Sequence, residues 1–153
     1  MSSGAKYVQP GAGHCYRILG GDEVYVKASA EDTGGRYTVF ETTVPPQGGP
    51  PPHVHHREEE TFYVLEGQFE FKVGDQLVSA GTGAFLIAPK DVPHTFRNVG
   101  ATPGRLIIMI TPGGFERFIE EFATLPTDRP PDVVKMAEMG ARHGLEFLLS
   151  APL

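Results

Sequence analysis

Residues 49–60 are Gly-Pro-Pro-Pro-His-Val-His-His-Arg-Glu-Glu-Glu, and a later apolar run begins at His94. In an extended stretch His53 and His55 point to the same side, because side chains alternate along a strand. Glu60 opens the next apolar run, so all four side chains can converge inside one β-structure. Imidazole and carboxylate groups together bind divalent metals such as Fe, Mn, Ni, Co, Cu and Zn. The stretch therefore predicts a pocket for one divalent metal ion, with the ligands His53, His55, Glu60 and His94.

The five-residue offset between His55 and Glu60 places them on opposite faces of a continuous strand. A turn or bulge between them must reset the register if both bind one metal. His56 faces away from His55, so a ligand role is not expected for it. Glu58 and Glu59 are interpreted as solvated charges on the turn, although either could replace Glu60 as a ligand if the loop register differs.

The bulk properties of the 153 residues favour a single domain, 1–153, that does not bind nucleic acid or membranes. The net charge is −6, whereas nucleic-acid binding selects for a basic face. No apolar run approaches the roughly 20 residues that a membrane span needs. Residues 1–6 lack the apolar stretch of a secretory signal, and Cys15 is the single cysteine, so nothing requires an oxidising compartment. We expect a cytoplasmic protein.

Short apolar runs alternate with turns rich in glycine and proline, which is typical of an all-β sandwich or barrel. Strands are predicted at 14–19, 23–28, 36–44, 53–55, 61–65, 68–73, 76–79, 84–88, 94–99 and 105–111. The barrel thus occupies about 14–111, and about 112–153 forms a helical cover. Apolar residues at helical spacing predict one short helix over 115–122, and a second helix is expected over 131–143. Residues 145–149 form a last strand or a packed tail.

Two segments resemble the two signature motifs of the cupin family. The first runs from Gly49 to Gly67 and the second from Gly83 through Pro89 to Asn98. The resemblance implies a cupin-type β-barrel, a double-stranded β-helix or jelly roll, with two short C-terminal helices. It places the metal ligands of the family on the four residues already singled out. Asp91 stands where the family usually has glycine, and Asp tolerates the left-handed conformation of a turn better than most residues.

A few residues near the motifs have two open interpretations. Phe62, Phe85 and Phe96 could line a ligand pocket, or they could belong to the ordinary core of the barrel. Asn98 is expected to bond to backbone groups, as Asn commonly does near turns. Arg57 can pair with the neighbouring carboxylates.

The segments 60–67 and 111–116 look most like small quercetinase-like cupins. That resemblance implies a metal-dependent dioxygenase that cleaves a flavonol or a similar enolic or phenolic compound. Glu60 would then be both a ligand and the catalytic base. The alternatives are a non-redox metal-dependent isomerase or lyase, and a non-enzymatic small-molecule binding cupin. A homodimer is also expected, because both faces of strand 61–65 are apolar and the C-terminal amphipathic segments offer further surface.

Overall fold

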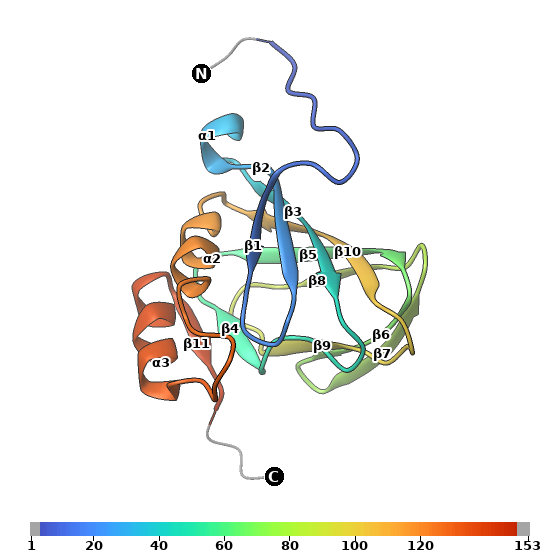
Figure 1. Cartoon of the computed structure of the whole chain (residues 1–153), viewed down its shortest axis with the longest axis vertical. Helices are drawn as coiled ribbons and strands as arrows, with labels where there is room; N and C mark the ends of the chain where they lie inside the picture. Colours follow the sequence, from blue (N-terminus) through green and yellow to red (C-terminus); the bar gives the residue numbers. More distant parts are fainter. Residues whose placement is uncertain (1–3, 150–153) are drawn as a thin grey trace.

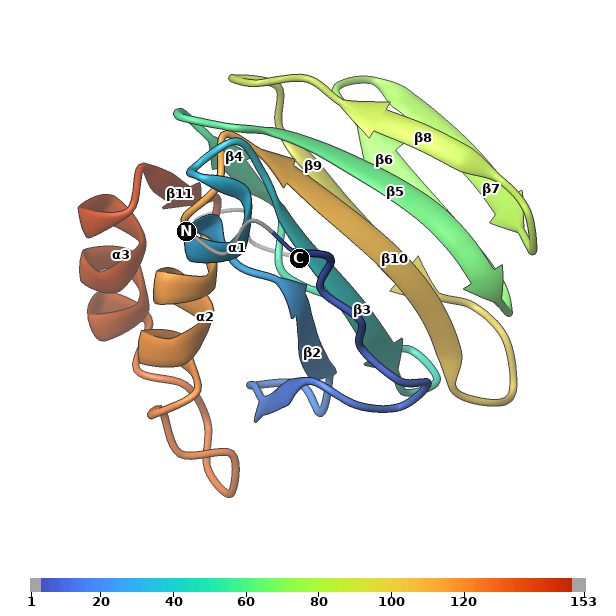
Figure 2. The same cartoon turned by 90° about the horizontal axis from the view of Figure 1, so that it is seen from above.

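Two antiparallel β-sheets face one another, and two helices lie against one side of them (Figures 1 and 2). The structure is a computed structural model that describes residues 4–149, so the two ends of the predicted domain lie outside the described residues. The six-stranded sheet has the strand order β1 (His14–Arg17), β2 (Glu23–Ala28), β3 (Thr38–Val44), β10 (Gly104–Thr111), β5 (Glu59–Glu66) and β8 (Phe85–Ala88). The five-stranded sheet has the order β11 (Leu145–Phe147), β4 (His53–His55), β9 (His94–Asn98), β6 (Gln68–Val73) and β7 (Gln76–Gly81).

The inner face of the six-stranded sheet is set by strict alternation. Every second residue of β3 is buried, from Thr38 to Val44, and the same period runs through β10. In the register of these strands, Ile110 lies opposite Thr38 on one side and Glu60 on the other. Glu60 therefore belongs to a row of inward-facing side chains near one end of the sheet.

The core between the sheets is built mainly from phenylalanine. Phe62 and Phe71 come from opposite sheets, and their ring centroids lie 5.0 Å apart in a tilted arrangement. Phe96 lies 5.7 Å from Phe62, edge to face, which is a favourable geometry for aromatic pairs. This packing joins the strands that carry the histidines to the strand that carries Glu60.

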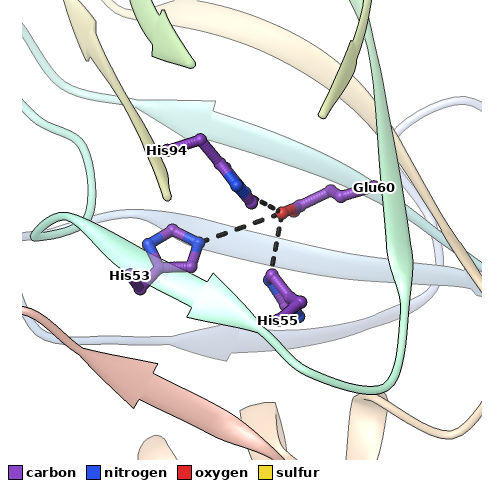
Figure 3. Close-up of side chains that lie close together, drawn as sticks. All are labelled: His53, His55, Glu60 and His94. Carbon is purple, nitrogen blue, oxygen red and sulfur yellow. Dashed lines mark hydrogen bonds and ion pairs between the residues drawn. The ribbon is translucent and has the colours of Figure 1, made fainter. Parts of the chain in front are cut away.

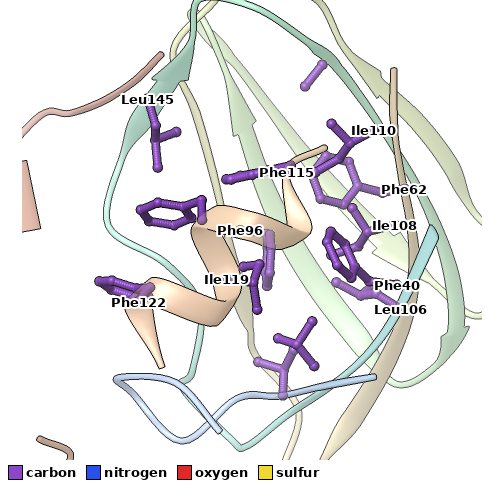
Figure 4. Packing of buried hydrophobic residues seen from close by; sticks show 14 of the residues in the cluster. Phe40, Phe62, Phe96, Leu106, Ile108, Ile110, Phe115, Ile119, Phe122 and Leu145 are labelled. Atoms are coloured by element: carbon purple, nitrogen blue, oxygen red, sulfur yellow. The ribbon is translucent and has the colours of Figure 1, made fainter. Parts of the chain in front are cut away.

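The C-terminal helices form a cover over one side of the sandwich. Helix α2 (Glu116–Phe122) turns its apolar stripe inward, and Figure 4 shows Phe115, Ile119 and Phe122 pointing toward the strands. Glu116 holds this helix in place, because its carboxylate accepts hydrogen bonds from Thr38 Oγ1 at 2.5 Å and from the backbone N–H of Ala30 at 2.7 Å.

Helix α3 (Val133–Arg142) packs beside α2 and buries Met136 and Met139. Arg142 and His143, at its C-terminal end, both contact the carboxylate of Glu121 on α2. Helix α2 is therefore hydrogen-bonded to the six-stranded sheet, and α3 is joined to α2 by ion pairs.

The predicted all-β jelly roll with two short C-terminal helices is confirmed. Three local predictions were less accurate. Helix α3 begins at Val133 rather than at residue 131, because Asp132 caps it and accepts a hydrogen bond from the Lys135 N–H at 3.1 Å. The short helix α1 (Ala30–Thr33) was not predicted, although Ser29 and Asp32 form its capping box. Strand β3 begins at Thr38, two residues later than expected.

Among the described residues no helix is long and apolar enough to cross a bilayer. The cytoplasmic location expected from the sequence stays a prediction.

Candidate metal centre

Four buried side chains meet between the two sheets (Figure 3). His53, His55 and His94 come from the five-stranded sheet, and Glu60 reaches them from the six-stranded sheet. Glu60 Oε2 lies 3.9 Å from Nε2 of His53, 3.1 Å from Nε2 of His55 and 2.7 Å from Nε2 of His94. All four potential ligand atoms lie within 4.8 Å of one another. The structure thus brings together every residue of the predicted ligand set.

The far nitrogen of each imidazole has its own partner. His53 Nδ1 lies 2.8 Å from the carbonyl oxygen of Pro51, and His94 Nδ1 lies 3.1 Å from that of Val92. A carbonyl oxygen can only accept, so Nδ1 must carry the hydrogen in both rings. The neutral ring then presents a lone pair at Nε2, which is the atom that faces the centre. Partners of this kind orient histidines that bind metals.

His55 is oriented by a carboxylate instead of a carbonyl, because its Nδ1 lies 3.1 Å from Glu58 Oε2. Burial alone would lower the pKa of His55, but the carboxylates of Glu60 and Glu58 raise this pKa to about 9. Burial alone would raise the pKa of Glu60, yet the surrounding histidines hold it well below its ordinary value. Both shifts therefore favour a positive charge beside the ionised carboxylate of Glu60.

This donor set fits a divalent metal ion. A neutral His94 directs the Nε2 lone pair at Glu60 Oε2, only 2.7 Å away, and both atoms are then acceptors. Two acceptors at that separation require a positive charge between them, which either a proton or a metal cation can supply. Three imidazole nitrogens and one carboxylate oxygen are ligands that Fe, Mn, Ni, Co, Cu and Zn accept.

The proline-rich segment 45–52 delivers β4 to the centre. It is hydrogen-bonded to β9, since the Gln47 N–H donates to the carbonyl of Asn98 at 2.8 Å and the Asn98 N–H donates to that of Gly48 at 2.9 Å. The turn before His94 is tied to β4 in the same way, because the Asp91 N–H donates to the carbonyl of His55 at 2.9 Å. These bonds set His53 directly opposite His94 in the strand register.

Asp91 has a φ of 67°, so it adopts the left-handed conformation that Asp tolerates better than most residues. Asn98 also behaves as expected: its side-chain amide donates to the carbonyls of Val44 and Thr102, both at 2.9 Å. Its carbonyl oxygen accepts from the Gly100 N–H. Both residues shape the backbone beside the centre without entering it.

The prediction that Glu58 is solvated was wrong. This residue was interpreted as a solvated charge, but it is 8% exposed and bonds to His55. Glu59 is exposed, and Glu60 occupies the centre. His56 is exposed as expected and lies 2.8 Å from both Asp91 and Glu146.

His55 and Glu60 do not belong to one continuous strand with a bulge, because the chain changes sheets between them. Residues 56–58 carry the chain from the five-stranded sheet to the six-stranded sheet, so the two side chains face each other across the core. Among the described residues Arg57 forms no ion pair with the neighbouring carboxylates, and its guanidinium donates instead to the carbonyl of Arg142.

A cavity of about 400 Å³ opens beside the centre, within the size range of small-molecule sites. His53, His55 and Glu60 form part of its wall, and most of the remainder is apolar. The aromatic part of the lining consists of Phe40, Phe96, Phe115, Phe118, Phe122 and Phe147. The centre is therefore accessible to a largely apolar molecule.

Phe62, Phe85 and Phe96, which the sequence left as either pocket lining or barrel core, lie in three different environments. Phe96 lines the cavity, and Phe62 lies in the core, 6.1 Å from the His94 ring. Phe85 is 64% exposed on the edge strand β8, so neither interpretation applies to it. Phe115, whose ring lies 4.7 Å from that of His55, was not predicted as a site residue. Its only signal was the first position of the apolar stripe of α2.

Comparisons with known proteins agree with this architecture. Residues 40–110 match the family model described as a cupin domain. Over 103 residues the chain is 30% identical to quercetin 2,3-dioxygenase from Bacillus subtilis (strain 168), a match that covers 67% of this chain and 30% of that enzyme. The chain spans about a third of the length of the curated relatives it matches.

Solved structures share the fold. A predicted oxalate decarboxylase from Thermotoga maritima is similar with a TM-score of 0.66 at 21% identity, over 69% of this chain and 98% of that chain. The polyketide cyclase RemF from Streptomyces resistomycificus is similar with a TM-score of 0.61 at 25% identity, over 70% of this chain and 79% of that chain. The two signature segments, the jelly roll and the matched family model together show that this chain belongs to the cupin superfamily.

Proposed function

We propose that this protein is a metal-dependent dioxygenase that cleaves a flavonol or a similar enolic or phenolic compound. The observation that carries the proposal is the buried cluster of three histidines and one glutamate, which opens into an aromatic-lined cavity. The similarity to quercetin 2,3-dioxygenase supports the same substrate class.

The proposed ligands are His53, His55, Glu60 and His94. A divalent ion held by them would polarise a chelating enol or phenol and acidify its hydroxyl, and a redox-active ion would also support dioxygen chemistry. Glu60 has a second carboxylate oxygen beyond the one that faces the histidines. We assign it the role of accepting the hydroxyl proton of the substrate.

The apolar wall of the cavity would position the substrate and exclude water. Phe115 stands edge-on to the His55 ring, so a flat aromatic substrate next to the centre lies against it. The C-terminal helices cover this part of the cavity and limit the access of water. Exclusion of water strengthens every electrostatic interaction at the centre and protects reactive species from hydrolysis.

A second candidate is a non-oxidative isomerase or lyase that uses the same centre. The likeness to the polyketide cyclase RemF, at 25% identity, favours this candidate. The two reactions differ in their need for oxygen and for a redox-active metal, since Zn²⁺ has no redox chemistry.

The test combines metal analysis with oxygen consumption. Elemental analysis of the purified chain should give about one divalent ion per chain. His94→Ala should lose most of that metal, whereas His14→Ala, at an exposed histidine outside the cluster, should retain it. Oxygen uptake with quercetin or 3-hydroxyflavone should depend on the metal and disappear in His94→Ala. Substrate conversion without oxygen uptake would favour the isomerase or lyase, and binding without conversion would favour a binding protein.

A further inference from the structure

Asp22 is a buried acidic residue that the proposed chemistry does not use. It lies between β1 and β2 and is 4% exposed. Its backbone carbonyl accepts a hydrogen bond from the Ile18 N–H, which closes the turn. Its side-chain oxygen Oδ1, however, has no hydrogen-bond partner among the described residues. No other buried side-chain oxygen or nitrogen in the described part of the chain is left unpaired.

An unpaired buried carboxyl is costly to the fold. Leaving a buried polar group unsatisfied typically costs about 1–3 kcal/mol, and more if the group is charged. Such groups are rare in folded proteins and call for an explanation. Burial raises the pKa of Asp22 to about 7, so its protonated and ionised forms are both accessible near neutral pH. The carboxyl can therefore donate as well as accept a hydrogen bond.

Asp22 lines the same cavity as the metal centre but at a different level. Glu60 lies in the strand row of Ile110 and Thr38, whereas Val24, two residues after Asp22, is paired with Thr42. The distance along β3 from Thr38 to Thr42 is roughly 13 Å at the usual rise of a strand. The two polar groups thus mark separate positions along an elongated cavity.

The wall around Asp22 is apolar. The residues of the β1–β2 turn that line the cavity with it are Ile18, Leu19 and Gly20. In Figure 4 the blue β1–β2 turn passes below Ile119 and Phe122, on the opposite side of the cluster from Ile110. The other titratable side chains of the cavity wall are His53, His55 and Glu60, which belong to the metal centre. A ligand group that reaches this position therefore meets Asp22 as its titratable partner, and the hydroxyl of Thr42 is the other polar side-chain group of this part of the wall.

We propose that Asp22 is a specificity-determining residue that hydrogen-bonds a hydroxyl group at the end of the substrate remote from its chelating group. A hydroxyl is the matching partner for the Asp22 carboxyl, because it can donate to the ionised form of the carboxyl and can also accept from the protonated form. The preferred substrate is then an elongated aromatic molecule with a chelating group at one position and a phenolic or alcoholic hydroxyl at another. The chelating end rests on the proposed function, whereas the hydroxyl end rests on Asp22 alone.

The test uses two non-chelating probes that differ only at the hydroxyl, 4-phenylphenol and 4-methoxybiphenyl. Calorimetry with the purified full chain should show roughly tenfold tighter binding of the phenol, the value of about one hydrogen bond to such a group. Asp22→Leu should abolish this preference. Asp75→Leu, which removes an exposed carboxyl outside the cavity, should keep it. Equal affinities in the wild-type chain, no binding of 4-phenylphenol, or a preference that survives in Asp22→Leu would each overturn the inference.

Thermal unfolding supplies a second readout that needs no ligand. If Asp22 serves a ligand, Asp22→Leu should leave the melting temperature unchanged or raise it, because a costly unpaired group is removed. A clear drop in the melting temperature would mean that Asp22 supports the fold, and the inference fails.

A third probe separates this inference from the proposed function. Binding of 3-hydroxyflavone, which carries only the chelating group, should weaken in His94→Ala and be unaffected by Asp22→Leu. If 3-hydroxyflavone binds equally well in His94→Ala, the proposed function fails while the result with the phenol still decides the role of Asp22.

Discussion

At the scale of single residues, Glu60 combines two roles whose effects can be separated. The amide of Glu60→Gln can still coordinate through its oxygen, but it cannot accept the substrate proton. We predict a loss of turnover of roughly 100-fold or more, which is typical of a missing general base. The fall in bound metal should be much smaller, so turnover per bound metal is the quantity to measure.

Glu59→Gln is the matched control, because Glu59 is the exposed neighbour of Glu60. Its turnover should equal that of the wild-type chain. Near-normal turnover per bound metal in Glu60→Gln would show that Glu60 is only a ligand.

The buried carboxyl of Asp22 makes the free energy of unfolding depend on pH. Burial raises its pKa from the ordinary 3.8 to about 7 in the folded chain, so between these two pH values the folded state keeps a proton that the unfolded state has lost. Stability from this group therefore falls as pH rises from about 4 to about 7, by up to roughly 4 kcal/mol. The pH profile of Asp22→Asn should lack this fall.

Urea unfolding of both chains at pH 5 and pH 8 tests this prediction. The other ionisable groups are present in both chains, so their contributions cancel in the difference. A difference between wild type and Asp22→Asn that stays constant over this range would contradict the raised pKa.

The ligand residues were predictable from the sequence, whereas their supporting residues were not. Residue type and spacing marked His53, His55 and His94, because a metal site needs particular atoms at particular intervals. Three consecutive glutamates share one residue type, so the sequence could not tell that Glu58 turns inward to His55. The burial of Asp22 was equally hidden, since it depends on how the β1–β2 turn packs against residues far away in the sequence.

At the scale of elements, the proline-rich segment 45–52 depends on one glycine. Gly49 has a φ of 146°, and a Cβ atom there would lie 1.9 Å from the carbonyl oxygen of Phe96. Gly49→Ala should therefore displace the segment from β9 and separate His53 from His94. We predict a large loss in the free energy of unfolding together with a loss of bound metal.

Gly11→Ala is the control for backbone conformation. Gly11 also has a positive φ, of 71°, but an added Cβ meets nothing within 4 Å. This variant should cost only about 1 kcal/mol and should retain its metal. Urea unfolding and elemental analysis compare the two variants, and equal costs would show that the contact with β9 is unimportant.

Most strands were predictable because the alternation of buried and exposed residues is a local property of the chain. The passage from β4 to β5 was not. The sequence showed that the register must change between His55 and Glu60, but a bulge and a move to the opposite sheet satisfy that requirement equally well. Only the packing of the two sheets distinguishes them.

At the scale of the whole molecule, the expected homodimer keeps one of its two supporting arguments. The apolar stripes of α2 and α3 are buried, and although Val133 and Val134 at the start of α3 are exposed, the helices offer no large apolar surface to a partner. The outer face of the six-stranded sheet, in contrast, exposes neighbouring apolar side chains on β5, β8 and β10. These are Tyr63, Phe85, Ile87 and Met109.

We propose that a second copy of the chain covers this outer apolar face, next to the edge strand β8. Sedimentation of the wild-type chain should give about twice the monomer mass of 16.6 kDa. The double variant Phe85→Glu, Ile87→Lys should sediment as a monomer. Leu77→Glu, at a similarly exposed position on β7 of the other sheet, should remain dimeric. A wild-type mass that stays at the monomer value at every concentration excludes the dimer.

The division of the four ligands between two sheets has a consequence for the path of a substrate. An ion bound to His53, His55 and His94 on one sheet and to Glu60 on the other would be a reversible cross-link between the two sheets. The sheets could then not part at this point without releasing the ion. A molecule that enters the cavity would then pass walls that carry no ligand, such as the C-terminal helices and the β1–β2 turn. If a molecule enters past the turn that carries Asp22, it would meet this residue before it reaches the ion.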